Sequence, residues 1–143
     1  MSRILGNELM PKLVDRINSR EFVSVVATSS ENIPNTAPIS FIYALNERIL
    51  RMVVFNEHTT LRNIMHNPHI SMSLIGEHNT AVSIGGIAKV ICDINNEFSL
   101  VEIEITSVKS DRSPHCEITH GVAIRVNDES LGIINNIFEQ IKK

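Results

Sequence analysis

The sequence has no tryptophan, and aromatic residues make up only 4% of its 143 residues. Proteins that bind single-stranded nucleic acid stack the bases on aromatic rings, so this composition argues against that class. Positive charge is also scarce, because 13 Lys and Arg stand against 16 Asp and Glu and the formal net charge is −3. A nucleic-acid-binding surface needs a basic stripe. Nucleic acid is therefore not an expected partner.

Cysteine and long apolar runs are equally scarce. The two cysteines, Cys92 and Cys116, are too few for a disulfide framework. Cys92 stands in an apolar stretch and is expected in the core, whereas Cys116 stands in a polar loop and is expected at the surface. No apolar run reaches the roughly 18 residues that cross a bilayer, and residues 1–8 lack the apolar core of a signal peptide. These absences predict a cytoplasmic protein without a membrane segment.

The residues that are present predict a β-barrel. Hydrophobic residues make up 43% of the chain, enough for the core of one domain over residues 1–143. Runs rich in β-branched residues, separated by turn residues, predict strands at 22–28, 37–45, 49–55, 70–75, 81–92, 100–108 and 118–126. Short connections favour an antiparallel closed sheet. The first three strands are apolar on both faces, so the barrel interior covers one face and a helix, a ligand or a partner chain covers the other.

Two turns and a glycine pair mark where this sheet bends. The composition of residues 29–35 predicts a turn, and the short polar segment 46–48 predicts a hairpin. Gly85-Gly86 lies inside the strand predicted at 81–92. A glycine pair at such a position indicates a bulge, a bend or a close approach of backbones.

Three segments have a helical pattern. Near the N-terminus, Asn7 is the expected cap, and the regular part of the helix is expected to begin at Pro11. A short helix is expected at residues 60–66, ended by Asn67-Pro68. Ser130 is the expected cap of a C-terminal helix. The apolar stripes of the first and last helices are Leu9, Leu13, Val14 and Ile17, and Leu131, Ile134, Ile137, Phe138 and Ile141.

The segment that joins the strand at 49–55 to the short helix is a candidate phosphate site. The hydroxyls of Thr59 and Thr60 and the free N–H groups of a helix start suit a phosphate, and Arg62 has the charge to neutralise it. The ordinary alternative is that one threonine simply caps the helix. Local pattern alone favours this alternative.

Neither a metal site nor a catalytic triad is predicted. His115-Cys116 with His120 is the nearest arrangement to a metal cluster, but its spacing matches no standard ligand pattern. The sequence contains no Gly-x-Ser-x-Gly, no P-loop and no Gly-x-Gly-x-x-Gly. Catalytic residues are therefore left unassigned.

The order of the segments is more informative than any one of them. The strand at 22–28 is followed by Ala37-Pro38-Ile39-Ser40-Phe41, by 50–55, by 59–68 leading into 70–74, and by 82–90. The most recognisable piece is the run Arg-Asn-Ile-x-x-Asn-Pro-x-Ile-Ser, which begins at Arg62. Over roughly residues 7–108 this succession resembles the pyridoxamine 5′-phosphate oxidase-like, FMN-binding split-barrel family.

The resemblance implies a mainly β fold with flanking helices, a six- to seven-stranded antiparallel split β-barrel of the Greek-key type. It also implies a homodimer with FMN at the subunit interface, and a flavin-dependent oxidoreductase of unknown substrate. Carried over residue by residue, it places Ser40, Phe41 and Ile42 near the flavin ring, Val53, Val54 and Phe55 along the flavin, and Thr59, Thr60, Arg62 and Asn63 at the phosphate.

The sequence departs from the family pattern at its basic positions. True pyridoxamine 5′-phosphate oxidases have a basic second strand and a Ser-Arg-Lys before the short helix. Here the corresponding positions are Pro38, near Tyr43, and His58-Thr59-Thr60. Arg62, Arg51 and backbone donors remain for the phosphate. Oxidation of pyridoxamine 5′-phosphate itself is therefore not expected.

A second hypothesis keeps the barrel without the enzyme. The weak basicity of the phosphate site favours a non-enzymatic binding module for haem or another flavin-like ligand. His115 and His120 are then the side chains to test for haem.

Overall fold

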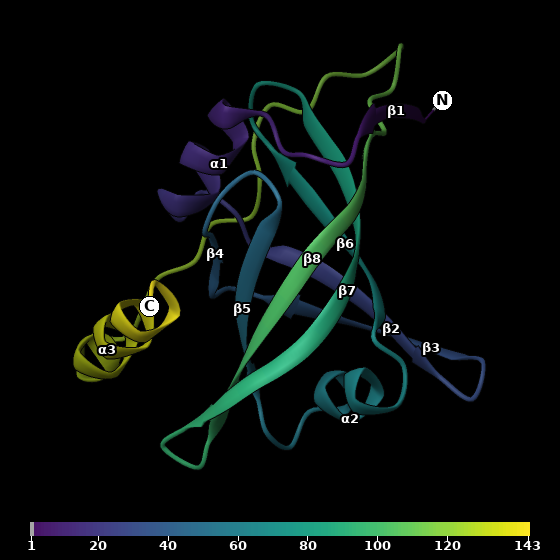
Figure 1. The fold of residues 1–143 in the computed structure, drawn as a ribbon. Coiled ribbons are helices and arrows are strands. Elements are labelled where there is room, and N and C mark those ends of the chain that lie inside the picture. The colour runs from purple at the N-terminus through teal and green to yellow at the C-terminus, as the bar shows by residue number, and fades with distance from the viewer. Residues whose placement is uncertain (1) are drawn as a thin grey trace.

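The computed structural model describes residues 2–143, which form eight strands, three α-helices and one short 3-10 helix (Figure 1). The elements in chain order are β1 (Arg3–Gly6), α1 (Pro11–Asn18), β2 (Ser24–Ser30), β3 (Ile33–Ile39), β4 (Ile42–Ala44), β5 (Ile49–Phe55), α2 (Thr59–His66), β6 (His69–Gly76), β7 (Thr80–Ile94), β8 (Phe98–Ser110), η1 (Asp128–Ser130) and α3 (Leu131–Ile141). None of the helices in this part of the chain is long and apolar enough to cross a membrane.

All strand pairs are antiparallel. The sheet order is β3-β2-β6-β7-β8-β5-β4, and β1 pairs with β8. The long strands β7 and β8 run through the middle of the molecule, with α1 and α2 at opposite ends (Figure 1). The predicted antiparallel, mainly β fold with flanking helices is confirmed. The structure has eight strands rather than the predicted seven, because β1 was not foreseen, one predicted strand is divided and the strand predicted at 118–126 is absent.

Alternate side chains of the strands form the main core. Its most deeply buried members come from five strands and are Val26, Met52, Leu74, Ile84, Val101 and Ile103. The helices at the two ends close it, α1 with Ile17 and α2 with Leu61 and Ile64. Removal of these apolar side chains from water is the main force that holds the sheet in its curled form.

A second apolar cluster lies on the opposite face of β5 and β8, beneath α3. Val53 and Leu100 are buried there against Ile137, Phe138 and Ile141 of the helix. A helix of the same chain therefore covers the outer apolar face of β5. The sequence left a helix, a ligand or a partner chain as possible covers, and on β5 the cover is a helix.

The glycine pair in β7 is both a bulge and a close contact. The register with β8 shifts between Gly85, opposite Ser107, and Gly86, opposite Ile105. A Cβ on Gly86 would lie 2.5 Å from Ile103 Cγ2 and 2.8 Å from the Glu104 carbonyl oxygen. The predicted bulge and close approach are confirmed.

The predicted cap of the first helix is wrong. Met10, not Asn7, is the N-cap of α1, and Pro11 is the first helical residue, as the sequence suggested. The segment before Pro11 is held in an extended form, since the Leu9 N–H donates to the Glu47 carbonyl at 2.8 Å. Proline lacks the N–H and has the φ that suit a first helical position, so it begins the helix.

The second predicted strand, 37–45, is divided. β3 begins earlier, at Ile33, and the turn before it shrinks to Glu31-Asn32, which have φ values of 53° and 64°. Such positive φ values belong to the two-residue turns of tight hairpins. β3 pairs with β2, whereas β4 pairs with β5. Because the chain changes its partner strand between them, β3 ends at Ile39 and a new strand begins at Ile42.

The predicted last strand, 118–126, is wrong. Residues 111–127 contain no helix or strand. Ile118 exchanges hydrogen bonds with Asn79, both at 3.1 Å, and a Cβ on Gly121 would lie 2.7 Å from the Ile75 carbonyl oxygen. The segment therefore passes the β6–β7 turn and the end of β6 through single contacts rather than a ladder. Val122 and Ile124 stay exposed, so burial of apolar surface does not hold these residues in a strand.

Two side chains lie elsewhere than expected. Cys92 is exposed rather than in the core, because it follows a register shift in the part of the β7–β8 hairpin where the neighbouring Ile91 is also exposed. Cys116 is exposed, as predicted. Ser130 is the N-cap residue of α3, but its side chain makes no capping hydrogen bond.

Asp111 attaches the start of the chain to the sheet. Its carboxylate accepts hydrogen bonds from the hydroxyls of Ser2 and Ser83. These two hydrogen bonds, with a smaller contribution from the charge of Lys109, hold the pKa of Asp111 below its ordinary value. The contact holds the N-terminal segment near the end of β8.

Candidate functional site

The N-terminus of α2 is the centre of the predicted phosphate site. His58 is its N-cap residue and makes no side-chain capping hydrogen bond. The first N–H groups of a helix have no partner within the helix, and together with the helix dipole they favour an anion. Arg62 Nη2 donates to Thr59 Oγ1 at 3.1 Å, and both side chains are exposed. A hydroxyl, a guanidinium and a helix start thus lie on one surface.

The other two predicted phosphate residues are buried. Thr60 is 1% exposed, and its Oγ1 accepts a hydrogen bond from Asn35 Nδ2 at 3.4 Å. Asn63 Nδ2 donates to Thr28 Oγ1 at 3.1 Å within the protein. These side chains attach α2 to β2 and β3. Of the four residues, only Thr59 and Arg62 present their side chains to solvent.

An aromatic surface adjoins the start of α2. The Phe55 side chain is 42% exposed, although phenylalanine is usually buried. Its ring centroid lies 4.7 Å from that of Phe98 and 5.1 Å from that of His58. His58 was not predicted as a site residue, although it stands within the segment that was singled out. The exposed Phe55 ring, with His58 beside it, offers an apolar face to a flat ring system.

The remaining predicted residues fall on two sides of β5. Ile42 and Val54 point into the main core. Val53 is buried on the outer face beneath α3, and the Phe41 carbonyl accepts its N–H at 3.0 Å. Ser40 and Phe41 are half-buried in the break between β3 and β4. The Phe41 ring meets the edge of Phe138 of α3, with centroids 5.7 Å apart.

Arg51 has partners within the protein. Its Nε and Nη2 each lie 3.1 Å from Glu102 Oε2, and its Nη1 donates to the Ile141 carbonyl at 3.2 Å. Arg51 therefore holds the C-terminal end of α3 against the sheet. This leaves Arg62 as the basic residue at the start of α2.

The histidines and cysteine considered for a metal or haem lie in the segment 111–127. His115, Cys116 and His120 are all exposed, and the ring of His120 is hydrogen-bonded to the Thr119 hydroxyl at 2.6 Å. Within residues 2–143 no three His, Cys, Asp or Glu side chains lie close enough to hold a metal ion.

The fold and sequence together identify the family. A family model described as pyridoxamine 5′-phosphate oxidase matches residues 9–109. The chain belongs to the pyridoxamine 5′-phosphate oxidase-like family. The resemblance seen in the sequence is thereby confirmed, and the predicted flavin-site residues lie inside the matched region. The segment 111–127 and α3 lie beyond it.

Solved structures show that the pyridoxamine 5′-phosphate oxidase-like split barrel is shared. A candidate pyridoxamine 5′-phosphate oxidase from Lactobacillus delbrueckii has a TM-score of 0.65 at 17% identity, covering 76% of this chain and 98% of that chain. HupZ from Group A Streptococcus has a TM-score of 0.63 at 11% identity, covering 80% and 100%. A FAD-binding protein from Mesorhizobium loti has a TM-score of 0.57 at 13% identity, covering 76% and 94%. At these identities the likeness establishes the fold alone.

No curated protein sequence matches this chain. The function therefore has to be argued from the residues of the site.

Proposed function

We propose that this protein binds FMN with the phosphate at the N-terminus of α2, and that it is a flavin-dependent oxidoreductase. The observation that carries the proposal is the exposed Thr59–Arg62 pair at a helix start without a side-chain cap. Membership of the pyridoxamine 5′-phosphate oxidase-like family supports it. A flavin, when bound, supplies the electron-transfer chemistry, and the protein supplies binding, orientation and exclusion of water.

Each part of this surface has a distinct task. Arg62 neutralises phosphate charge, and the Thr59 hydroxyl and the N–H groups of the first turn donate hydrogen bonds. The Phe55 ring packs against the apolar part of the flavin. Because Ile42 and Val54 face the core, they contribute through their backbone groups. Asn63 and the Thr60 side chain hold α2 in place.

The charge of this site argues for a substrate other than pyridoxamine 5′-phosphate. Arg51 is paired with Glu102, and Thr59 and Thr60 stand where the pattern of true oxidases has two basic residues. The FMN phosphate then binds one guanidinium and one helix N-terminus. Among the described residues, no second basic cluster adjoins them to bind a phosphorylated substrate. A neutral or weakly charged substrate fits this surface better.

We expect Arg62→Ala to weaken FMN binding by about 10- to 100-fold, because a charge-assisted hydrogen bond contributes about 1.5–3 kcal/mol. The measurement is a titration of the purified protein with FMN, followed by flavin fluorescence. Arg48→Ala, an exposed residue of the β4–β5 turn, is the matched control and should change affinity less than about twofold. Unchanged affinity in Arg62→Ala, or a protein that takes up no FMN, would contradict the proposal.

We also propose that the protein is a homodimer with the flavin at the subunit interface. The outer surface of β2 and β6 exposes Val25 and Ile75. In the sheet, Val25 lies opposite Pro38 on one side and Ser73 on the other, so its neighbours are short side chains. A flat, partly apolar surface of this kind suits a second copy.

Sedimentation equilibrium should give about twice the chain mass of 16.0 kDa. Val25→Asp places a charge on the flat surface and should shift the protein toward the monomer. The same substitution at the solvated Thr106 of β8 is the control. A wild-type protein that stays monomeric at tens of micromolar would overturn the interface proposal.

A further inference from the structure

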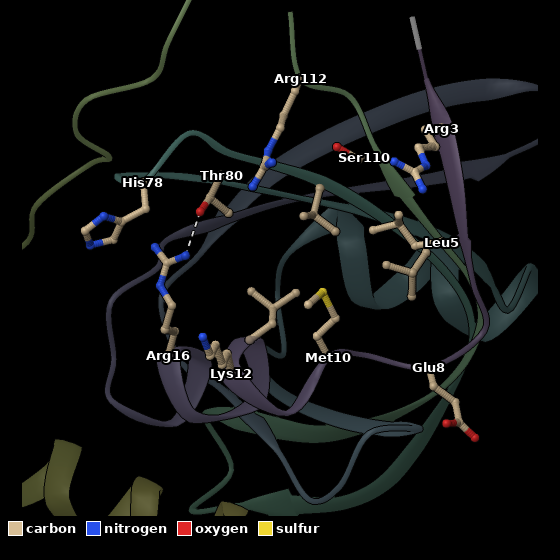
Figure 2. Close-up of a pocket in the computed structure, with 13 residues that line it drawn as sticks. Arg3, Leu5, Glu8, Met10, Lys12, Arg16, His78, Thr80, Ser110 and Arg112 are labelled. Atoms are coloured by element: carbon tan, nitrogen blue, oxygen red, sulfur yellow. Dashed lines mark hydrogen bonds between the residues drawn. The ribbon is translucent and has the colours of Figure 1, made fainter.

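A cleft of about 770 Å³ lies at the end of the barrel where α1 is found (Figure 2). Its walls come from β1, the start of α1, the first residues of β7, and β8 with the residues that follow it. None of the predicted flavin-site residues lines it, and α2 is at the opposite end of the barrel (Figure 1). Clefts of roughly 300–1,000 Å³ accommodate small organic ligands.

Positive charge gathers around this cleft although the whole chain has a net charge of −3. Arg3, Lys12, Arg16 and Arg112 line it, and Glu8 is the one acidic residue among the lining residues. Figure 2 shows the guanidinium groups of Arg3 and Arg112 pointing toward the cavity and the Glu8 carboxylate pointing away from it. The electrostatic field inside the cleft therefore favours an anion.

Two of these arginines are held in position. Arg16 Nη1 donates to Thr80 Oγ1 at 2.6 Å, and its Nε pairs with Glu21 at 2.8 Å. Arg112 Nε donates to the Asn79 carbonyl at 2.7 Å. Among residues 2–143, the ion pairs of Arg and Lys with carboxylates are Arg16–Glu21 and Arg51–Glu102. Arg3, Lys12 and Arg112 are thus not neutralised by a carboxylate of the protein.

Most of the remaining lining is apolar, with the polar side chains of His78, Thr80 and Ser110 beside it. The apolar members are Leu5, Met10, Leu13, Val82 and Val108. Leu5 is 42% and Met10 61% exposed, so both side chains meet water beside the cationic groups. An apolar ligand surface that covered them would release this water and gain free energy. A small inorganic anion would leave them uncovered.

We propose that this cleft is a second binding site, specific for a small amphipathic organic anion with one acid group on an apolar body. The guanidinium groups of Arg3 and Arg112 receive the acid group, because planar guanidinium forks match carboxylate and phosphate oxygens. The apolar body lies over Leu5, Met10 and Leu13. The site is separate from the α2 surface and does not depend on flavin binding.

The test uses decanoate, below its micelle threshold, as the probe in isothermal titration calorimetry with the full chain. Decanoate should bind at least about tenfold more tightly than decanol, which has the same apolar body without the charge. The double variant Arg3→Ala/Arg112→Ala should weaken decanoate binding at least about tenfold. Arg125→Ala, an exposed arginine that does not line the cleft, should change it less than about twofold.

A second variant keeps the test decisive if the double variant does not fold. Met10→Glu places a carboxylate at an exposed position of the lining and should weaken decanoate binding by a similar factor. Equal binding of decanol and decanoate, or unchanged affinity in the folded variants, would overturn the proposal. So would displacement of decanoate by FMN, because the two ligands would then share one site.

Two further experiments distinguish a small organic anion from inorganic phosphate and from a lipid surface. Inorganic phosphate at the same concentration should not compete with decanoate, since it leaves the apolar lining exposed. Vesicles of phosphatidylglycerol should not retain the protein on flotation. If the vesicles retain it and free decanoate does not bind, the cationic face recognises a lipid surface and the small-molecule site is wrong.

Discussion

Gly86→Ala is expected to lower the free energy of unfolding by about 3 kcal/mol, the upper part of the range for overpacking a close-packed site. The new Cβ would lie 2.5 Å from Ile103 Cγ2 and 2.8 Å from the Glu104 carbonyl oxygen. The second contact is with backbone. To relieve it, β7 and β8 would have to separate beside the Gly86–Ile105 pair, in the middle of the sheet. Urea denaturation monitored by circular dichroism measures the effect.

Two other glycines are controls for this substitution. A Cβ on Gly85 would meet the Ser107 hydroxyl at 2.6 Å, and that side chain is able to rotate away. A Cβ on Gly132 of α3 would meet nothing within 4 Å, so alanine there should stabilise the helix by about 0.5–1 kcal/mol. The expected order of stability is Gly132→Ala, then Gly85→Ala, then Gly86→Ala. Equal losses at Gly85 and Gly86 would show that β7 and β8 are not packed as described.

Phe138→Ala is expected to cost about 3–5 kcal/mol of unfolding free energy, the range for removing a buried phenylalanine. The Phe138 side chain is only 4% exposed and contacts Phe41 edge-on. The Arg20 guanidinium lies 3.6 Å from the centre of its ring, which adds a cation–π contribution. Loss of the ring leaves a cavity between α3 and the outer face of β5.

The same substitution should also release α3. Limited proteolysis is expected to cleave Phe138→Ala within residues 111–143 faster than wild type, because α3 loses its largest buried side chain from the cluster that contains Val53 and Leu100. Ile133→Ala, on the exposed side of the same helix, is the matched control and should change stability by less than about 0.5 kcal/mol. Equal effects of the two variants would mean that α3 does not lie on this face.

Local sequence patterns predicted the helices and strands whose form depends on residues close to them in the sequence. The strand 49–55 has the predicted bounds, and α2 begins one residue before the prediction and ends at its predicted last residue. Pro11 began the first helix because its fixed φ acts locally. The pattern at 118–126 failed, although it is as β-like as the others. Val122 and Ile124 remain exposed, so this segment buries no apolar face that would hold it in the sheet.

For the predicted flavin-site residues, too, the sequence located the helix but did not show which side chains are exposed. The sequence grouped Thr59, Thr60, Arg62 and Asn63 at the start of a short helix, and the structure places the helix there. The sequence did not show which of them point outward. Thr60 and Asn63 are buried because α2 docks on β2 and β3, where Thr28 and Asn35 receive them. The flavin assignment itself remains a prediction for the FMN titration to test.

The sequence by itself determined the family, the antiparallel pairing of the strands, the short helix after β5 and the glycine contact in β7. These features depend on alternation, turn residues and steric limits within short windows. Only the tertiary structure showed that α3 covers β5 and that Arg3, Arg16 and Arg112 surround one cleft. Residues so far apart along the chain share no local pattern. Strand pairing and helix docking bring them together, and so determine which side chains are buried and which meet a ligand.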